Sequence, residues 1–260
     1  MAKRFGLATI AVGLLACWVA AGPAPALAPA DLAVASSRTA LPQARVVSLG
    51  LFGPQSVFES EARRAAAVLS QWLGTSVPPV VRFNTKRRAN VSPEIIAATL
   101  RAAGATMDPT KGLLAVELTS HGSPAGLAIV AGRRQRTLTP RELRAMLDAS
   151  GAKYRVVIIS ACYSGVFLPA LADARTLVIT AAAADRSSFG CEDRARWTYF
   201  GDAFFNRALR RAPDLETAFD VARRLVTARE QREGFVPSNP QIGGGFEVLA
   251  LLARRDRPAP

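Results

Sequence analysis

The order of the predicted elements indicates an α/β fold, a three-layer α/β/α sandwich around a mainly parallel sheet. Short apolar runs of strand length alternate with segments of helical periodicity along almost the whole chain. Two runs, 112–119 and 155–159, are apolar nearly throughout, as expected of strands that are buried on both faces. No linker-like segment divides the chain, so we expect one domain over residues 44–253.

Local signals place the individual elements. Gly74 is predicted to end the first helix, Ser92-Pro93 to begin the second, and Thr139 with Glu142 to form a capping box at the start of the third. The apolar or β-branched runs predict strands at 45–51, 80–83, 112–119, 127–130, 155–159, 177–180 and 246–252. Helical periodicity predicts helices at 57–72, 93–104, 140–150, near 164, 199–209 and 215–230. Polar loops are expected at 183–197 and 234–245.

The two ends of the chain differ from the predicted domain. Residues 1–28 have the layout of a secretory signal peptide, with Lys3-Arg4, an apolar run and small residues around 26–28. An Ala- and Pro-rich flexible leader is expected at 29–43 and a basic tail at 254–260. We therefore predict an exported protein, periplasmic or secreted. A lipoprotein anchored through Cys17 is the less favoured alternative, because the chain stays apolar after that cysteine.

The formal net charge is +13, carried mostly by arginine. The arginines are scattered along the sequence and lack interleaved aromatic residues, so we interpret them as a solvated basic surface and expect no specific nucleic-acid binding. Weak attraction to an anionic envelope surface is the alternative. With one histidine and no zinc-finger, HExxH or phosphate-loop spacing, no metal or other cofactor is expected.

Two predicted strands end in groups with catalytic chemistry. Cys162 follows the strand 155–159, and His121, the single histidine of the chain, follows the strand 112–119. Parallel sheets bind ligands beyond the carboxyl ends of their strands, where neighbouring strands bring such residues together. A histidine is the usual partner of a nucleophilic thiol, and the backbone amides of Gly122 and Cys162 are candidates for an oxyanion hole. A buried structural cysteine and a satisfied structural histidine remain the alternatives.

Two sequence blocks resemble the His-Gly and Ala-Cys blocks of the legumain-like cysteine peptidases, which are relatives of the caspases with the caspase-haemoglobinase fold. The blocks are Thr119-Ser120-His121-Gly122-Ser123 and Ser160-Ala161-Cys162-Tyr163-Ser164-Gly165. Segments 180–182, 186–191 and 198–202 are similar to the region of that family after the nucleophile. The resemblance implies that Cys162 is the nucleophile and His121 the proton donor and acceptor. It also implies cleavage of a peptide bond through a thioester, with no cofactor.

The resemblance also assigns residues around the dyad. Ser160, Ser188 and Asp202 match positions that line the substrate pocket, where relatives that cut after asparagine carry an acidic residue in place of Ser160. A polar or basic substrate residue is therefore expected, while a helix-face carboxylate and a loop hydroxyl are the alternatives for Asp202 and Ser188. Cys191 matches a family cysteine that is not the nucleophile. Gln55 is the amide nearest to the expected place of the family's supporting asparagine, and the sequence assigns it no role.

The predicted function is that of an exported cysteine endopeptidase acting on peptide or protein substrates. Caspase-like domains also occur without activity, so a catalytically silent binding module at the cell envelope is the alternative. Cys162 and Cys191 could pair in an oxidising compartment and silence the thiol, a less favoured form of redox control. The sequence predicts no oligomeric state.

Overall fold

The computed structural model describes residue 41 and residues 43–254. The predicted signal peptide, nearly all of the predicted leader and residues 255–260 of the basic tail lie outside the described residues. Within the described part, no helix combines the length and apolar character needed to cross a membrane.

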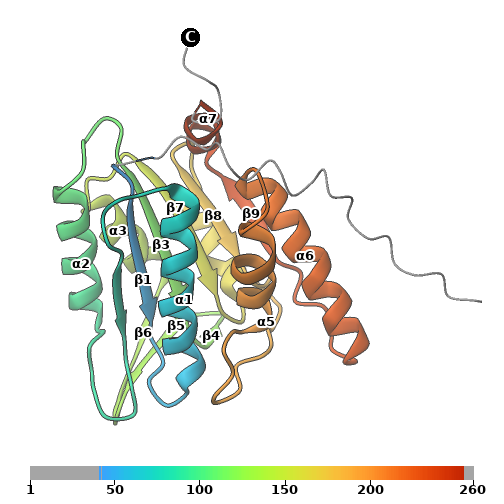
Figure 1. Cartoon of the computed structure of the whole chain (residues 1–260). Coiled ribbons are helices and arrows are strands. Elements are labelled where there is room, and N and C mark those ends of the chain that lie inside the picture. The colour runs from blue at the N-terminus through green and yellow to red at the C-terminus, as the bar shows by residue number, and fades with distance from the viewer. Residues whose placement is uncertain (1–40, 42, 255–260) are drawn as a thin grey trace, which may run out of the picture. The chain divides into compact units, whose positions relative to one another are not determined.

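A six-stranded sheet forms the centre of the described domain (Figure 1). Its strand order is β2-β1-β3-β7-β8-β9, and five strands run parallel while β9 is antiparallel to β8. The bounds are β1 Arg45–Gly50, β2 Val80–Phe83, β3 Leu113–Thr119, β7 Tyr154–Ser160, β8 Thr176–Thr180 and β9 Gln241–Gly244. A smaller antiparallel sheet consists of β4 Gly122–Ser123, β5 Gly126–Ala131 and β6 Arg134–Leu138.

Helices cover both faces of the central sheet and make the predicted three layers. One apolar cluster includes side chains of α1 (Ser56–Leu73), the π-helical segment η4 (Asp202–Leu209), α6 (Leu215–Arg232) and α7 (Phe246–Arg254). The other includes side chains of α2 (Pro93–Ala105), α3 (Pro140–Asp148), the 3₁₀ turn η3 (Ser164–Phe167) and α4 (Leu168–Leu171). A short helix, α5 (Tyr199–Gly201), leads directly into η4. The fold class predicted from the sequence is confirmed.

The alternation of side chains along β7 explains its uninterrupted apolar sequence. Val156 and Ile158 belong to the first cluster, and Val157 and Ile159 belong to the second. Each successive residue of a strand points to the opposite face, so a strand covered on both sides needs apolar residues at every position. The same arrangement holds β3 next to β7 and fixes where both strands end.

The predicted helix signals are largely confirmed. Gly74 ends α1 in the left-handed conformation, with φ 64°. The Ser92 hydroxyl accepts a hydrogen bond from the Ile95 amide at the start of α2. Thr139 and Glu142 form both bonds of the capping box of α3. These local motifs fold as the sequence predicts because they need no distant partner.

The prediction for the last elements was wrong. Residues 246–254 form α7 rather than a strand, while Gln241–Gly244, expected as part of a loop, is the edge strand β9. Val248 and Leu252 are four residues apart and buried on one face, whereas Phe246 is 68% exposed, which is a helical rather than an alternating pattern. The glycines of β9 give it low intrinsic strand propensity, so pairing with β8 decides its conformation.

Candidate active site

The carboxyl ends of β3 and β7 bring the two predicted catalytic residues to one edge of the sheet. Thr119 pairs in register with Ser160, and the Ser120 amide donates a hydrogen bond of 3.2 Å to the Ser160 carbonyl. His121 and Cys162 each lie two residues beyond this last pair. The parallel register therefore places them at equivalent positions on neighbouring strand ends, and both are half-buried.

Gln55 holds His121 in a defined tautomer. The Gln55 side-chain amide donates a hydrogen bond of 2.7 Å to the Cys191 carbonyl, which can only accept. Its Oε1 therefore faces His121 Nε2, at 2.5 Å, and Nε2 must carry the proton. The other ring nitrogen, Nδ1, has no hydrogen-bond partner among the described residues. A neutral imidazole held in this way presents a free lone pair.

Two phenylalanines pack their edges against the His121 ring. The ring centroids lie 4.5 Å from Phe52 and 5.1 Å from Phe58. Burial among these apolar groups lowers the pKa of His121 below its usual value of 6.5, because the charged form loses hydration. The histidine is thereby kept neutral, the form that can accept a proton from a thiol.

Cys162 sits at the start of a tight turn. The Ser188 amide donates to its sulfur at 3.2 Å, and the thiol can donate to the Ser188 carbonyl at the same distance, so the backbone of Ser188 holds the sulfur in place. Tyr163 follows in the left-handed conformation with φ 54°, and its amide donates to the Arg186 carbonyl at 2.7 Å. A non-glycine residue in this conformation stores strain that the surrounding structure must offset. The turn thus presents the cysteine at the strand end while the 186–188 segment supports it.

The backbone amides of Gly122 and Cys162 are both without a hydrogen-bond partner among residues 43–254. The Ala128 amide donates to the His121 carbonyl, so in the alternating pattern of an antiparallel pair the Gly122 amide points away from β5. A Cβ atom on Gly122 would lie 2.0 Å from the Cys162 carbonyl oxygen, so only glycine allows this close approach.

Cys191, the other cysteine of the described residues, has a different environment. Burial, with a smaller contribution from the neighbouring Cys162, raises the pKa of its thiol to about 12. Both cysteines are free thiols, without a disulfide between them. Cys191 therefore contributes its carbonyl, which fixes Gln55, rather than a reactive sulfur.

The three residues expected to line the substrate pocket lie in different surroundings. Ser160 is 2% exposed, and its hydroxyl pairs with that of Thr198 at 3.0 Å beneath the site. Ser188 contacts Cys162 through its backbone. The Asp202 carboxylate pairs with Arg207 at 2.8 Å and with Asn206. The structure thus brings Ser188 to the cysteine and engages Ser160 and Asp202 with other partners.

A pocket beside the cysteine turn is lined by residues that the sequence did not single out. It has a volume of about 460 Å³ and lies between the turn and the loop that follows α6. Its aromatic members, Phe189 and Phe235, stack with ring centroids 4.2 Å apart. Asp185, Arg186 and Tyr163 also line it. The surface next to Cys162 therefore combines an aromatic wall with one acidic and one basic side chain.

A buried pair of carboxyl groups lies under the site. Glu61 accepts hydrogen bonds from the Thr198 amide at 2.7 Å and the Thr119 hydroxyl at 2.9 Å, which ties α1 to the end of β3. Ser48 lies 2.7 Å from the Ala62 carbonyl and 2.5 Å from Glu117. The single Ser48 proton goes to the carbonyl, so Glu117 must donate the second bond and is protonated. Burial and the Glu61 charge raise the pKa of Glu117 well above 4.5.

Sequence reasoning missed Gln55, Glu61 and Glu117. Gln55 occupies the N-cap position of α1 without a side-chain capping bond, although Ser, Thr, Asp or Asn is preferred there. That local mismatch is a signal that the side chain serves another purpose. The two glutamates carried a weaker signal, a charged residue on an otherwise apolar face of a helix or strand. Within residues 43–254, no three His, Cys, Asp or Glu side chains are grouped closely enough to hold a metal ion.

Comparison with known proteins agrees with this geometry. The model of the peptidase C13 family matches residues 101–243, which include His121, Cys162 and Ser188. The chain belongs to the peptidase C13 family. This is the legumain family of cysteine peptidases, and the resemblance predicted from the two blocks is confirmed. No curated protein matches the chain.

Among solved structures, the chain is similar to the crystal structure of caspase-1 from Spodoptera frugiperda. The TM-score is 0.53 at 15% sequence identity, and the match covers 79% of this chain and 89% of the caspase chain. At this identity the likeness shows a common fold. The C13 chain thus has the caspase-like architecture that its sequence blocks predicted.

Proposed function

We propose that this C13 protein is an endopeptidase that uses Cys162 as nucleophile and His121 as general base and acid. The observation that carries the proposal is the chain of contacts from the Cys191 carbonyl through Gln55 to His121, which leaves Nδ1 free. A histidine oriented by a third group is the general arrangement that activates a nucleophile. A histidine with a purely structural role would not need a hydrogen-bond partner, the Gln55 side chain, that is itself held in place by a second hydrogen bond.

The reaction follows from these groups. His121 Nδ1 takes the proton of the Cys162 thiol, and the sulfur attacks the peptide carbonyl carbon. The amides of Gly122 and Cys162 donate to the oxygen, which becomes negatively charged in the tetrahedral intermediate. The C–N bond then breaks as His121 gives its proton to the leaving amine, and a thioester remains. Water, deprotonated by His121, hydrolyses the thioester and restores the thiol.

The substrate is a peptide or protein, as expected of a peptidase family. Export to the periplasm or outside the cell is proposed from the signal-like residues 1–28 alone. The pocket beside Cys162 is the proposed site for a substrate side chain, and its aromatic wall favours an apolar or aromatic residue there. The polar or basic preference expected through Asp202 has less support, since that carboxylate is already paired with Arg207.

Alkylation of the two thiols in one molecule distinguishes the peptidase from the alternative, a silent binding module. Iodoacetamide is added near neutral pH and the modified peptides are quantified by mass spectrometry. We expect Cys162 to react and Cys191 to stay unmodified, because the raised pKa of Cys191 keeps it protonated. The His121→Ala variant should slow the reaction of Cys162. Equal, slow modification of both thiols in both proteins would favour the silent module.

A further inference from the structure

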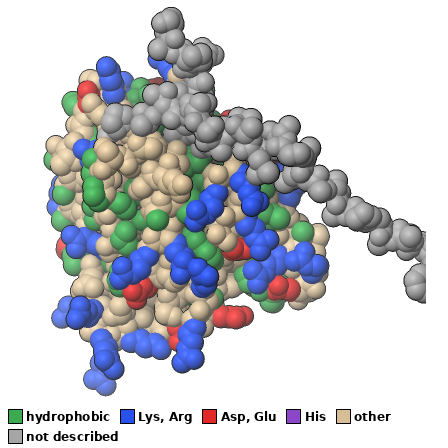
Figure 2. Space-filling model, viewed as in Figure 1, with side chains coloured by type: hydrophobic (Ala, Val, Ile, Leu, Met, Phe, Trp, Pro, Cys, Tyr) green, Lys and Arg blue, Asp and Glu red, His purple; other side chains and the backbone are tan. Residues whose placement is uncertain are grey.

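Six basic side chains gather on two loops at the carboxyl edge of the sheet. We call this set the basic patch. It consists of three residues of the β2–α2 loop and three of the β5–β6 hairpin, namely Lys86, Arg87, Arg88, Arg133, Arg134 and Arg136. All six are exposed. Figure 2 shows Lys and Arg side chains gathered along the lower edge of the view, where these two loops end in Figure 1.

Most of this charge has no ion-pair partner. Glu94 and Glu142, whose pKa values are lowered by hydrogen bonds and to a smaller extent by nearby Arg136, offset only part of it. Lys86 pairs with Asp193 at 3.4 Å, while the five arginines have no ion pair within 4.0 Å among the described residues. Like charges held side by side repel one another, and an anionic ligand would relieve that repulsion. The patch therefore has an unsatisfied preference for a negative partner.

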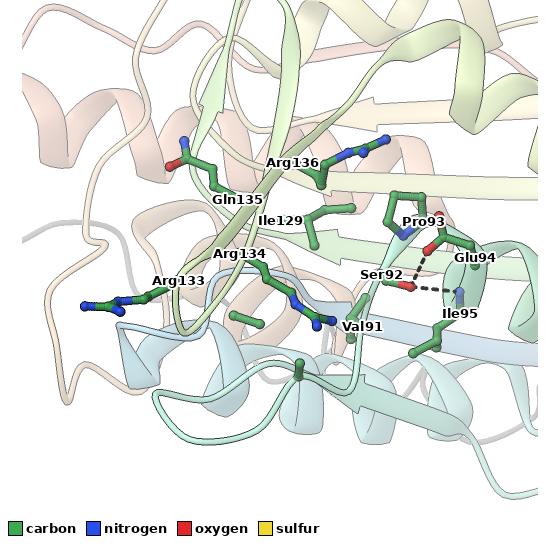
Figure 3. A pocket seen from close by; sticks show the side chains of 12 residues that line it. Val91, Ser92, Pro93, Glu94, Ile95, Ile129, Arg133, Arg134, Gln135 and Arg136 are labelled. Carbon is green, nitrogen blue, oxygen red and sulfur yellow. Dashed lines mark hydrogen bonds between the residues drawn. The ribbon is translucent and has the colours of Figure 1, made fainter.

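A pocket of about 550 Å³ opens within the patch (Figure 3). Its rim carries Arg133, Arg134 and Arg136, and its floor includes the apolar side chains of Val91 and Ile129. One carboxylate, Glu94, also lines it, and that group accepts a hydrogen bond from the Ser92 hydroxyl at 2.6 Å. A basic rim around an apolar floor suits an acidic segment that also carries an apolar side chain.

The patch is joined to the catalytic histidine by short contacts. Val130, two residues before the hairpin turn at Gly132, bonds with the Leu51 carbonyl at 3.0 Å and with the Gly53 amide at 2.9 Å. Phe52, between those two residues, packs its ring on His121. A Cβ atom on Gly53 would lie 2.5 Å from the Thr85 carbonyl, at the base of the β2–α2 loop. Both loops are thus packed against the segment that leads to Gln55.

We infer that the basic patch is an exosite for an acidic segment of a polypeptide substrate, with an apolar side chain of that segment in the pocket between the two loops. The inference rests on the proposed peptidase function. A polypeptide is favoured over a lipid surface because the patch and Cys162 lie at the same edge of the sheet. A chain that crosses Cys162 can continue over the patch, whereas a flat membrane on the patch would cover the catalytic edge.

Direct binding to the Cys162→Ala protein tests the exosite without requiring cleavage. The probes are a fluorescein-labelled peptide of Asp, Glu and Leu and a matched peptide in which Asn and Gln replace the acids. We expect the acidic peptide to bind on the order of tenfold more tightly, with the difference falling as salt is raised. Equal affinity of the two peptides would overturn the inference.

Two charge-matched variants locate the binding. The patch variant carries Arg87→Gln, Arg88→Gln, Arg133→Gln and Arg134→Gln, and should lose the preference for the acidic peptide. The control carries Arg101→Gln, Arg175→Gln, Arg210→Gln and Arg211→Gln, four exposed arginines that form no ion pair among the described residues and lie on other elements than the patch, and should keep the preference. Equal loss in both variants would show attraction to net charge alone and overturn the exosite.

Vesicles of phosphatidylglycerol distinguish the other anionic partner. Binding of vesicles that depends on the patch, without binding of the acidic peptide, would mean that the patch binds a lipid surface and is not an exosite.

In the active protein, an acidic extension of a cleaved peptide should lower KM and leave kcat unchanged. If the Cys162→Ala protein binds the acidic peptide and the parent cleaves nothing, the proposed function fails while binding at the patch stands.

Discussion

Three side chains control two properties of His121, its tautomer and its hydration. Gln55 fixes which nitrogen carries the proton, and Phe52 and Phe58 exclude water from the ring. Because the folded protein binds a proton at His121 less readily than the unfolded chain, this group contributes stability above pH 6.5 that is lost as the pH falls through the lowered pKa. The same shift keeps His121 neutral in mildly acidic solution, as its proposed role as a base requires.

Replacing Phe52 by alanine should move the acid limb of catalysis. In the parent, we expect kcat/KM to fall only below pH 6.5, since the pKa of His121 is lowered by burial. Phe52→Ala hydrates the ring, so the limb should move upward toward the usual histidine value. The measurement is kcat/KM against pH for both proteins. A limb that does not move, or moves to lower pH, would contradict the role given to burial.

Gln55 is expected to act on kcat through His121. Gln55→Leu removes both the acceptor for Nε2 and the donor to the Cys191 carbonyl, so the productive tautomer is no longer selected. We expect kcat to fall by about 10²-fold with little change in KM. Gln55→Glu supplies a negative acceptor instead and should raise the pKa of His121, which shifts the acid limb to higher pH. Gln71→Leu, an exposed position on the same helix, should leave both constants unchanged.

At the scale of elements, the contact between β4 and the end of β7 builds the catalytic edge. A side chain at Gly122 would meet the Cys162 carbonyl at 2.0 Å, so Gly122→Ala must push the two strand ends apart. We predict that this variant loses at least about 10²-fold in kcat, since an oxyanion donor and the cysteine move together. Gly132→Ala meets no neighbouring atom but strains the β5–β6 turn, since Gly132 has φ 59°, and so tests for general damage to the hairpin away from the site. Activity of Gly122→Ala equal to the parent would refute the oxyanion assignment.

The buried carboxyl pair between α1 and the sheet should make stability depend on pH. Glu117 has a raised pKa, so the folded state holds a proton that the unfolded chain releases above pH 4.5. Stability is therefore lost as the pH rises from 4.5 toward the raised value, by at most about 1.4 kcal/mol per pH unit. Glu117→Gln should reduce this slope and stabilise the protein at alkaline pH, while Glu61, whose pKa burial also raises, keeps its own smaller contribution. The free energy of unfolding, measured by denaturant unfolding at several pH values in both proteins, gives this slope.

A surface glutamate supplies the control for that experiment. Glu216→Gln changes the same charge at an exposed position of α6. Its stability curve should run parallel to that of the parent. If the stability curve of Glu117→Gln also runs parallel to that of the parent, Glu117 is ionised in the folded protein. The assignment of the Ser48 proton to the Ala62 carbonyl is then wrong.

The sequence predicts most elements because most are specified locally. The buried strands β3 and β7 are visible as apolar runs, and the caps of α2 and α3 involve residues three positions apart. β9 was mispredicted as a loop because two of its four residues are glycines and only pairing with β8 holds it extended. Cys162 and His121 were found because each follows a visible strand. Gln55 was not assigned, since its two partners lie 66 and 136 residues away in the sequence.

At the scale of the whole molecule, the position of the basic residues in the fold matters more than the net charge of +13 itself. In the sequence, residues 86–88 and 133–136 look like two of many scattered basic runs. The fold joins them because the β5–β6 hairpin packs against the segment after β1. This long-range packing turns a solvated basic composition into a local patch beside the proposed catalytic site. No pattern of arginines along the chain reveals that outcome.

Cleavage of a diverse peptide mixture tests the central claim most directly. The parent, Cys162→Ala and Cys191→Ala are each incubated with the mixture, and new termini are identified by mass spectrometry. The account predicts cuts within peptides by the parent and by Cys191→Ala, with apolar or aromatic residues enriched at the cut, and none by Cys162→Ala. Cuts that persist in Cys162→Ala, or that vanish only in Cys191→Ala, would contradict the assignment of Cys162 as the nucleophile.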